Sequence, residues 1–186
     1  MVAISGASGA AYAARLLQLL PEVYNTIYLT ASESAMGIIR RELGSETLSQ
    51  VLPKQQKSKF QLLSSTDLGA PPASGSHNYD GLIVIPCSMG ALGRIAAGVS
   101  DDLITRSADV CLKERRKLIL VVRETPLNLI QLRSMTTLAE AGAVILPACP
   151  AFYSKPKEIS DLVDFVVDRV LQLMGIDIGL TKGWGE

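Results

Sequence analysis

The strongest candidate for chemistry in this sequence is a charged pair that directly follows an apolar run. Arg123 and Glu124 come after the run KLILVV at positions 117–122, and Pro126 follows two residues later. A charge at the end of a buried strand is costly unless it is paired or used. An Arg in this place can bind a phosphate, and a Glu can move a proton. The alternatives are an Arg–Glu ion pair or two charges exposed at the rim.

Small residues and hydroxyls follow three further apolar runs. The first stretch is GASGA at positions 6–10, the second contains Thr30 and Ser32, and the third is PCSMGALG at 86–93. Small residues let the backbone approach a ligand, and a following helix offers free N–H groups to a phosphate. A tight turn without a ligand is the alternative for the first stretch, where Ser8 either caps the helix or faces a ligand; capping is the ordinary role of Ser32. Together the three junctions indicate a phosphate or flavin site.

Two cations share one face of an expected helix over residues 101–116. Arg106 and Lys113 are seven residues apart, so they lie about 10 Å apart along the helix axis. Asp102 and Asp109 each stand four residues before one of them. Surface ion pairs at this spacing are therefore the alternative to a ligand-binding role.

Two more candidates lie near the end of the chain. Tyr153 stands in a Pro-bounded loop, where a ring with a hydroxyl either packs on a ligand or packs within the protein. Arg169 falls beside Leu162 and Phe165 on the last expected helix. A cation close to the apolar face of a helix has two possible roles. Its charge either reaches a ligand or partner, or lies in water while the aliphatic part of the side chain packs on the protein.

Strands and helices are expected to alternate along the chain. The expected strands are 1–5, 23–30, 60–63, 81–87, 117–122 and 143–146. The expected helices are 10–20, 33–43, 45–52, 88–98, 101–116, 126–142 and 159–175. Strands that are apolar along their whole length fit a parallel sheet covered on both faces. The pattern predicts a single doubly wound α/β domain over residues 1–186, with a mainly parallel sheet and ligands beyond the carboxyl ends of its strands.

Composition excludes several classes of protein. The chain has 186 residues, of which 48% are hydrophobic and 19% charged, the opposite of a disordered chain. The 18 basic and 18 acidic residues cancel, which argues against a general nucleic-acid binder. With one His, a multi-His metal site is excluded and little His-based catalysis is expected.

The cysteines and the N-terminal segment indicate a reduced, cytoplasmic setting. Cys87, Cys111 and Cys149 are far apart, and each is expected to be a small buried hydrophobe. Residues 1–21 lack a basic segment, and Gly, Ser and Arg interrupt their apolar stretches. Neither a signal peptide nor a membrane span is expected.

Several motifs together resemble one family. They are GASGA at 6–10, APPASGS at 70–76, PCSMG at 86–90, LKERRKLILVVRETP at 112–126, GAVILPACPAFY at 142–153 and a closing WGE. This set is similar to the flavin prenyltransferases, or UbiX-like proteins, earlier described as aromatic-acid decarboxylases. The resemblance spans nearly the whole chain. It implies a three-layer α/β/α domain, Rossmann-like or flavodoxin-like, that binds FMN, needs no metal and assembles into a homododecamer.

The resemblance also implies a reaction. The family joins a dimethylallyl group from dimethylallyl phosphate to reduced FMN at N5 and C6, which builds a fourth ring. The product, prenylated FMN, is the cofactor of a partner decarboxylase of the UbiD type. Such chemistry needs no His, because the flavin is the nucleophile and cations stabilise the departing phosphate.

Position within the shared motifs implies a role for each candidate residue. The flavin would be lined by Gly6, Ala7, Ser8, Ser32, Ser88, Met89, Gly90 and Ala91 and contacted by Arg123. Dimethylallyl phosphate would be held by Tyr153 and Arg169, with Arg106 and Lys113 near the phosphate and the subunit interface. Glu124 would assist proton transfer with Ser8 close by, and Trp184 would close the site.

One departure and two alternative functions accompany the resemblance. Leu68 stands where the family often has a Trp, so a smaller apolar wall is expected there. The first alternative is an FMN-dependent decarboxylase that acts directly on an aromatic or peptidyl carboxylate. The peptidyl-cysteine decarboxylases use a His early in the chain, whereas His77 lies in a loop rich in Pro and Gly. The second alternative is a flavin carrier without enzymatic activity.

Overall fold

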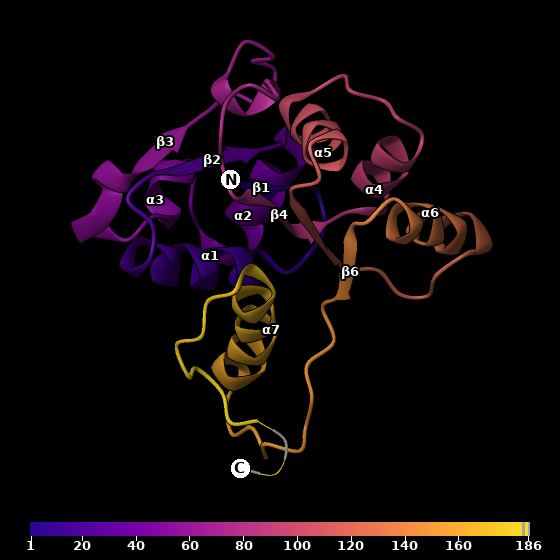
Figure 1. Cartoon of the computed structure of the whole chain (residues 1–186). Coiled ribbons are helices and arrows are strands. Elements are labelled where there is room, and N and C mark those ends of the chain that lie inside the picture. The colour runs from indigo at the N-terminus through magenta and orange to yellow at the C-terminus, as the bar shows by residue number, and fades with distance from the viewer. Residues whose placement is uncertain (184, 186) are drawn as a thin grey trace.

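The computed structural model of the chain describes residues 1–183 and 185 (Figure 1). Its sheet has six parallel strands in the order β3-β2-β1-β4-β5-β6. The strands are β1 (Val2–Ile4), β2 (Ile27–Ala31), β3 (Phe60–Leu62), β4 (Gly81–Cys87), β5 (Lys117–Val122) and β6 (Val144–Pro147). The chain moves outward from β1 to β3 and then returns to the other side of β1, so the direction of winding reverses between β1 and β4.

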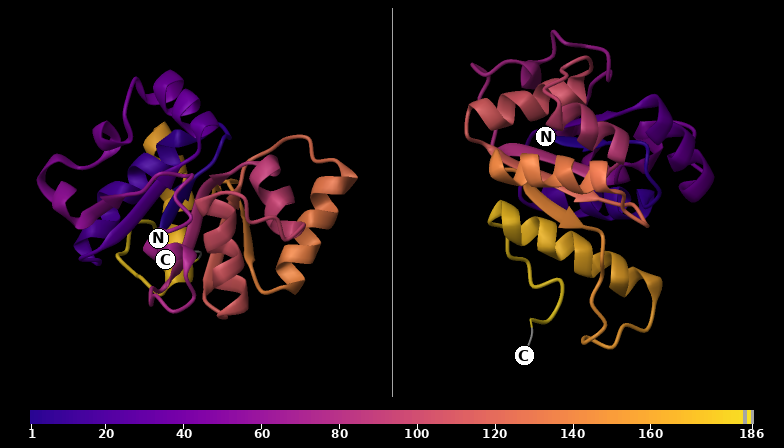
Figure 2. Two further views of the ribbon diagram at one scale, coloured as in Figure 1. Left: turned by 90° about the horizontal axis from the view of Figure 1, so that it is seen from above. Right: turned by 90° about the vertical axis from the view of Figure 1, so that its right-hand side faces the viewer.

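Helices cover both faces of the sheet, which makes three layers (Figure 2). One face is covered by α1 (Ala10–Leu19), α2 (Glu33–Leu43) and α7 (Ile159–Met174). The other face is covered by α4 (Met89–Ala96), α5 (Leu103–Lys113) and α6 (Leu129–Glu140). The short α3 (Leu48–Val51) lies between α2 and β3 in the chain. The predicted doubly wound α/β/α architecture is confirmed.

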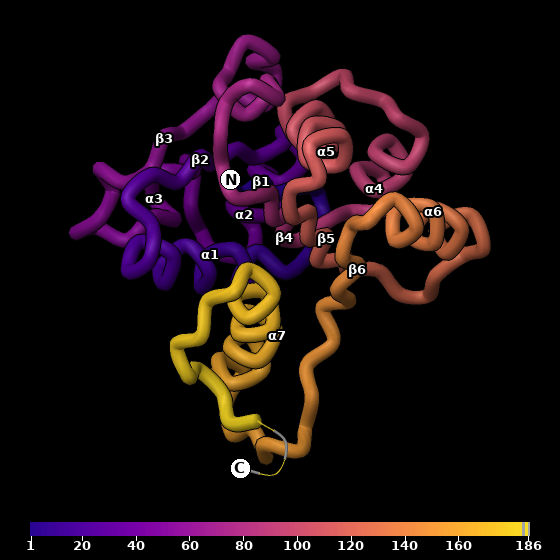
Figure 3. Tube along the Cα trace, in the orientation of Figure 1, coloured from indigo at the N-terminus to yellow at the C-terminus, as the bar shows by residue number. Residues whose placement is uncertain are grey.

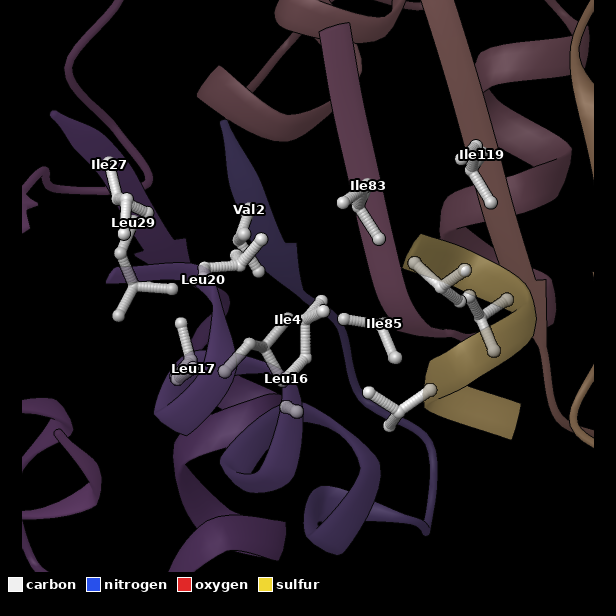
Figure 4. Packing of buried hydrophobic residues seen from close by; sticks show 14 of the residues in the cluster. Val2, Ile4, Leu16, Leu17, Leu20, Ile27, Leu29, Ile83, Ile85 and Ile119 are labelled. Atoms are coloured by element: carbon white, nitrogen blue, oxygen red, sulfur yellow. The ribbon is translucent and has the colours of Figure 1, made fainter. Parts of the chain in front are cut away.

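The strands are apolar along their length because each packs against both helical layers. In β1, Val2 and Ile4 belong to the cluster with α1 and α7, whereas Ala3 between them belongs to the opposite cluster. In β4, Ile83 and Ile85 follow the same division (Figure 4). Side chains of successive residues point to opposite faces of a sheet, so burial on both faces requires a continuous apolar run.

Several predicted boundaries are wrong, and for two of them the structure shows a local reason. Strand β2 begins at Ile27 rather than residue 23, because a 3₁₀ helix at Leu20–Glu22 with Pro21 in its first turn extends α1. Helix α6 begins at Leu129 rather than at Pro126. The Asn128 side chain accepts a hydrogen bond from the Gln131 backbone N–H at 2.9 Å and so caps the helix there.

The last part of the chain folds around α7. Arg15 on α1 forms an ion pair with Asp164 on α7, with 2.6 Å between Nε and Oδ1, which fastens the two helices. The segment after β6 runs along α7, and the segment after α7 returns beside it (Figure 3). None of the described helices combines the length and the apolar character that a membrane span requires.

Candidate functional site

The predicted junctions meet at the carboxyl edge of the sheet. The turn at residues 6–9 follows β1, Ser32 follows β2, Ser88 follows β4 and Arg123 follows β5. Because all six strands are parallel, these ends lie along one edge. The reversal between β1 and β4 places the first and third of these junctions next to each other, where folds of this kind open a crevice for ligands.

A buried serine ties those two junctions together. The Ser5 hydroxyl donates to the Pro86 carbonyl at 3.0 Å and accepts from the Ser88 backbone N–H at 2.7 Å. The Ser5 side chain is buried, so this bridge lies away from water. Ser5 therefore fixes the start of α4 relative to the turn after β1. Sequence reasoning missed this role, because only the strand order brings positions 5 and 88 together.

The turn after β1 is tight and has no room for larger side chains. A Cβ atom added at Gly6 would lie 2.7 Å from the Ser34 Cβ atom on α2, so only glycine fits between the two segments. Gly9 has a φ angle of 110°, a left-handed conformation that favours glycine, and it is the N-cap of α1. Ser8 is not the cap, so that alternative is wrong.

A carboxylate occupies the start of α1. Glu42, in the last turn of α2, accepts hydrogen bonds from the backbone N–H groups of Gly9 at 3.0 Å and Ala10 at 2.8 Å. Burial alone would raise the pKa of the Glu42 carboxyl, but hydrogen bonds from Ser8, Ala10 and Gly9 and the nearby charge of Arg123 outweigh it and lower that pKa. Glu42 thus takes two of the N–H groups that the start of α1 was expected to offer to a phosphate. Sequence reasoning missed Glu42, one of several charges on an exposed helical face.

Pairs of adjacent free donors are found at the starts of α2 and α4. Ser32 and Ser88 cap these helices, each accepting from the backbone N–H three residues later. The two N–H groups between each cap and that bond are those of residues 33 and 34 in α2 and of residues 89 and 90 in α4. Within the described residues, these four N–H groups have no acceptor. A Cβ atom added at Gly90 would meet open space. Unpaired N–H groups beside open space suit an anionic ligand.

Arg123 and Glu124 stand at this edge without bonding each other. The Arg123 Nε atom donates to the Ser8 carbonyl at 3.1 Å, which fastens the end of β5 to the turn after β1. The Glu124 carboxylate is exposed and accepts from the Thr125 backbone N–H at 3.0 Å. The ion-pair alternative is wrong in the described part of the chain, because the two side chains form no salt bridge there.

Lys113 is not brought to this edge within one chain. Lys113 ends α5 only four residues before β5 begins, so it lies at the opposite, amino edge of the sheet. Arg106 pairs with Asp109 at 2.8 Å, and Lys113 pairs with Glu114 at 2.6 Å. The expected pairs at i,i+4 spacing are therefore wrong, since each cation found a nearer carboxylate.

The remaining candidates lie on and around α7. Arg169 lines a groove of about 350 Å³ between β6 and α7, beside Phe165 and Cys149. The Tyr153 ring packs edge-on against the Phe165 ring, with 6.0 Å between centroids. Tyr153 also lines a separate cavity of about 800 Å³ together with the C-terminal segment. Trp184 lies outside the described residues.

The cysteine prediction is wrong at one of three positions. Cys87 and Cys111 are buried, and burial raises the pKa of the Cys87 thiol to about 12. Cys149 is exposed, because the segment after β6 leaves the sheet edge. His77 lies before β4, away from the carboxyl edge, with its Nε2 atom 2.9 Å from the Tyr28 hydroxyl.

Known proteins share this fold and sequence over their whole length. The Flavoprotein family model matches residues 1–171. The flavin prenyltransferase UbiX of Methanocaldococcus jannaschii is 44% identical over 100% of this chain and 97% of its own. The UbiX protein of Pseudomonas aeruginosa is 39% identical over 100% of this chain and 93% of its own.

Solved structures agree with the sequence comparison. AnUbiX in complex with FMN and dimethylallyl pyrophosphate is 43% identical, with a TM-score of 0.92 over 100% of this chain and 96% of that one. A dodecameric FMN-dependent UbiX-like decarboxylase of Escherichia coli O157:H7 is 39% identical, with a TM-score of 0.90 over the whole of both chains. The peptidyl-cysteine decarboxylase EpiD is 15% identical with a TM-score of 0.62, so it shares the fold alone.

The doubly wound sheet and the small-residue turns at its carboxyl edge define a flavin-binding α/β protein. Within that class, the chain belongs to the UbiX family of flavin prenyltransferases.

Proposed function

We propose that this protein transfers a dimethylallyl group from dimethylallyl phosphate to N5 and C6 of reduced FMN. The observation that carries the proposal is its fold and sequence match, at a TM-score of 0.92 and 43% identity, to AnUbiX in complex with FMN and dimethylallyl pyrophosphate. We further propose that a single domain over residues 1–186 performs the reaction in the cytoplasm and that prenylated FMN passes to a UbiD-type decarboxylase. Three unpaired cysteines fit a reducing compartment.

The carboxyl edge has the features that FMN requires. The two adjacent N–H groups without an acceptor at the start of α2, and the two at the start of α4, suit the FMN phosphate. Open space at Gly90 leaves room for a flat ring. The cofactor surface proposed here consists of Gly6, Ala7, Ser8, Ser32, Ser88, Met89, Gly90, Ala91 and Arg123. Reduced FMN bound there supplies the nucleophile.

The charged residues at the carboxyl edge are proposed to have three different roles. Arg123, fastened through Nε to Ser8, keeps its two terminal nitrogens for an anion. Glu124 is exposed beside it and holds or releases the proton that ring closure moves. Glu42 remains ionised and keeps Ser8 and the turn after β1 in place.

The phosphate-binding part of the site is proposed to come from more than one copy of the chain. Lys113 lies at the opposite edge of its own sheet, so it reaches a substrate only at a neighbour's edge, and Arg106 is proposed to act with it. An UbiX-like relative from Escherichia coli is dodecameric, which supports such an arrangement. Tyr153, Arg169 and Trp184 complete the proposed dimethylallyl phosphate site.

The test uses pure protein, reduced FMN and dimethylallyl phosphate without oxygen. Mass spectrometry of the released flavin is expected to show an addition of one five-carbon unit. A parallel reaction with dimethylallyl pyrophosphate determines which phosphate the site accepts. Adding the product to a UbiD-type apoprotein is expected to restore its decarboxylation.

Two results would overturn the proposal. Recovery of unmodified FMN from both reactions would leave a flavin carrier. Release of CO₂ from an aromatic acid by this protein alone, without a partner, would identify it as a decarboxylase instead.

A further inference from the structure

An unusual carboxylate lies inside α7. Asp168 is only 1% exposed and neighbours the apolar core residues Val167 and Val170. Among the described residues no cation pairs with it, and its Oδ1 atom has no hydrogen-bond partner. A buried carboxylate without a cation is costly, and an apolar residue would pack there at lower cost. The position therefore calls for a role other than stability.

The other oxygen of Asp168 makes two bonds that lead in different directions. Its Oδ2 atom accepts from the Gln172 side-chain amide at 3.0 Å and from the Thr181 hydroxyl at 2.5 Å. Both donors are neutral, so the two bonds orient their partners without neutralising the charge.

The first bond fixes the side chain of Gln172. Because the amide nitrogen is held by Asp168, the amide oxygen points the other way and accepts from the Arg169 guanidinium. That guanidinium borders the groove between β6 and α7, beside Phe165. The orientation of Arg169 thus depends on a carboxylate that does not touch it.

The second bond fastens the C-terminal segment. Helix α7 ends at Met174, and Thr181, seven residues further on, bonds back to Asp168 within the helix. Leu180 packs against the core, and Leu180, Thr181 and Lys182 line the cavity that Tyr153 also lines. One carboxylate is therefore connected both to Arg169, through Gln172, and to the segment that lines the cavity of Tyr153.

We infer that Asp168 is a positioning residue, which orients Arg169 toward dimethylallyl phosphate through Gln172 and, through Thr181, holds the C-terminal segment that lines the cavity of Tyr153. This inference rests on the proposed function, in which Arg169 and Tyr153 bind that substrate. It assigns Asp168 no contact with substrate or flavin.

Separate variants test the two hydrogen-bonded connections of Asp168, one to Gln172 and one to Thr181. Gln172→Leu is expected to raise the KM for dimethylallyl phosphate about fivefold to tenfold with little change in kcat, as loss of one orienting hydrogen bond does. Thr181→Val is expected to speed tryptic cleavage after Lys182, read by mass spectrometry as loss of residues 183–186. Asp168→Ala is expected to show both effects with FMN affinity unchanged, and Asp168→Asn, which keeps one acceptor oxygen, a smaller change.

A variant of Asp177 provides the control for both measurements. Asp177→Asn alters an exposed carboxylate of the same segment and keeps the oxygen that accepts from Gly179, so both readouts should stay at wild-type values. Wild-type KM and cleavage in Asp168→Ala would overturn the inference while the proposed function stands. A wild-type protein that makes no prenylated FMN would overturn the proposed function and, with it, the role of Asp168 toward the phosphate.

Discussion

Two carboxylates at the carboxyl edge differ in their surroundings. Glu42 accepts two backbone hydrogen bonds and one from Ser8, so its charge is held in place. Glu124 is exposed, with one bond to the backbone of Thr125. A group that exchanges protons during a reaction must be accessible and loosely held, whereas one that positions a turn must stay ionised. We therefore propose Glu124 for proton transfer and Glu42 for positioning.

Replacing Glu124 by Gln is expected to leave FMN binding unchanged and to slow prenylation about 100-fold, the usual scale of a lost acid–base group. FMN fluorescence titration and product formation measured by mass spectrometry would show this. Glu140→Gln, on the far end of α6, is the control. Prenylation near the wild-type rate in Glu124→Gln would remove Glu124 from the mechanism.

Arg169→Ala is expected mainly to weaken binding of dimethylallyl phosphate, because a cation beside an apolar face suits a phosphate joined to a hydrocarbon chain. The apparent affinity for dimethylallyl phosphate, measured at saturating reduced FMN, provides the test. An unchanged affinity would contradict the proposed role.

Glu42 is expected to make stability depend on pH in the acid range. The folded state lowers the pKa of its carboxyl below the ordinary value of 4.5. The stabilisation is therefore complete above that value and is lost as pH falls through the lower, folded-state pKa. Urea unfolding should show Glu42→Gln to be less stable than the wild type by about 1 kcal/mol near neutral pH, with the gap closing in acid. A gap that stays constant with pH would contradict this.

How far single residues were predictable depends on the range of their contacts. The caps Ser32 and Ser88 could be identified, because a cap bonds to its own helix three residues away. Ser5 and Glu42 could not, since their partners lie 83 and 32 residues away. The sequence does not show near which edge of the sheet Arg106 and Lys113 lie.

At the scale of elements, the site depends on how firmly two strand ends are joined. The buried Ser5 hydroxyl bridges the end of β1 to the start of α4 with bonds of 3.0 and 2.7 Å. Strands and helices themselves were predictable, because burial on both faces demands continuous apolar runs. Boundaries were less so, since a 3₁₀ turn at Leu20–Glu22 and the cap at Asn128 displaced two of them.

Ser5→Ala is expected to lower the free energy of unfolding by about 1 to 3 kcal/mol, because the buried Ser88 N–H loses its acceptor. Urea denaturation measures this, and FMN affinity should fall as the two junctions loosen. Ser160→Ala, which removes an exposed hydroxyl, should change neither quantity. An equally stable Ser5→Ala protein would show that the bridge is not needed.

At the scale of the whole molecule, α6 presents apolar side chains to the outside. Leu129 is 59% exposed and Ile130 is 76% exposed. Apolar surface of this kind marks an interaction site, and an UbiX-like relative is dodecameric. The oligomer could be expected only from family resemblance, because a single chain's sequence does not separate an interface helix from a partly exposed one.

Ile130→Lys is therefore expected to yield a smaller assembly, detected by light scattering coupled to gel filtration. Prenylation should fall with it, since Arg106 and Lys113 are proposed to act on a neighbour's substrate. Glu140→Lys places the same charge elsewhere on α6 and should leave the assembly intact. An unchanged molecular mass for Ile130→Lys would place the interface on another surface.

The carboxylate of Glu42 has one more consequence, which concerns the size of the nucleotide. In sheets with this strand order, the start of the first helix commonly binds the pyrophosphate of a dinucleotide. Here that position already holds a permanent negative charge, bonded to Gly9 and Ala10. A pyrophosphate at this helix would meet electrostatic repulsion from that carboxylate. We therefore expect Glu42 to disfavour the binding of NAD or FAD at this position relative to a mononucleotide.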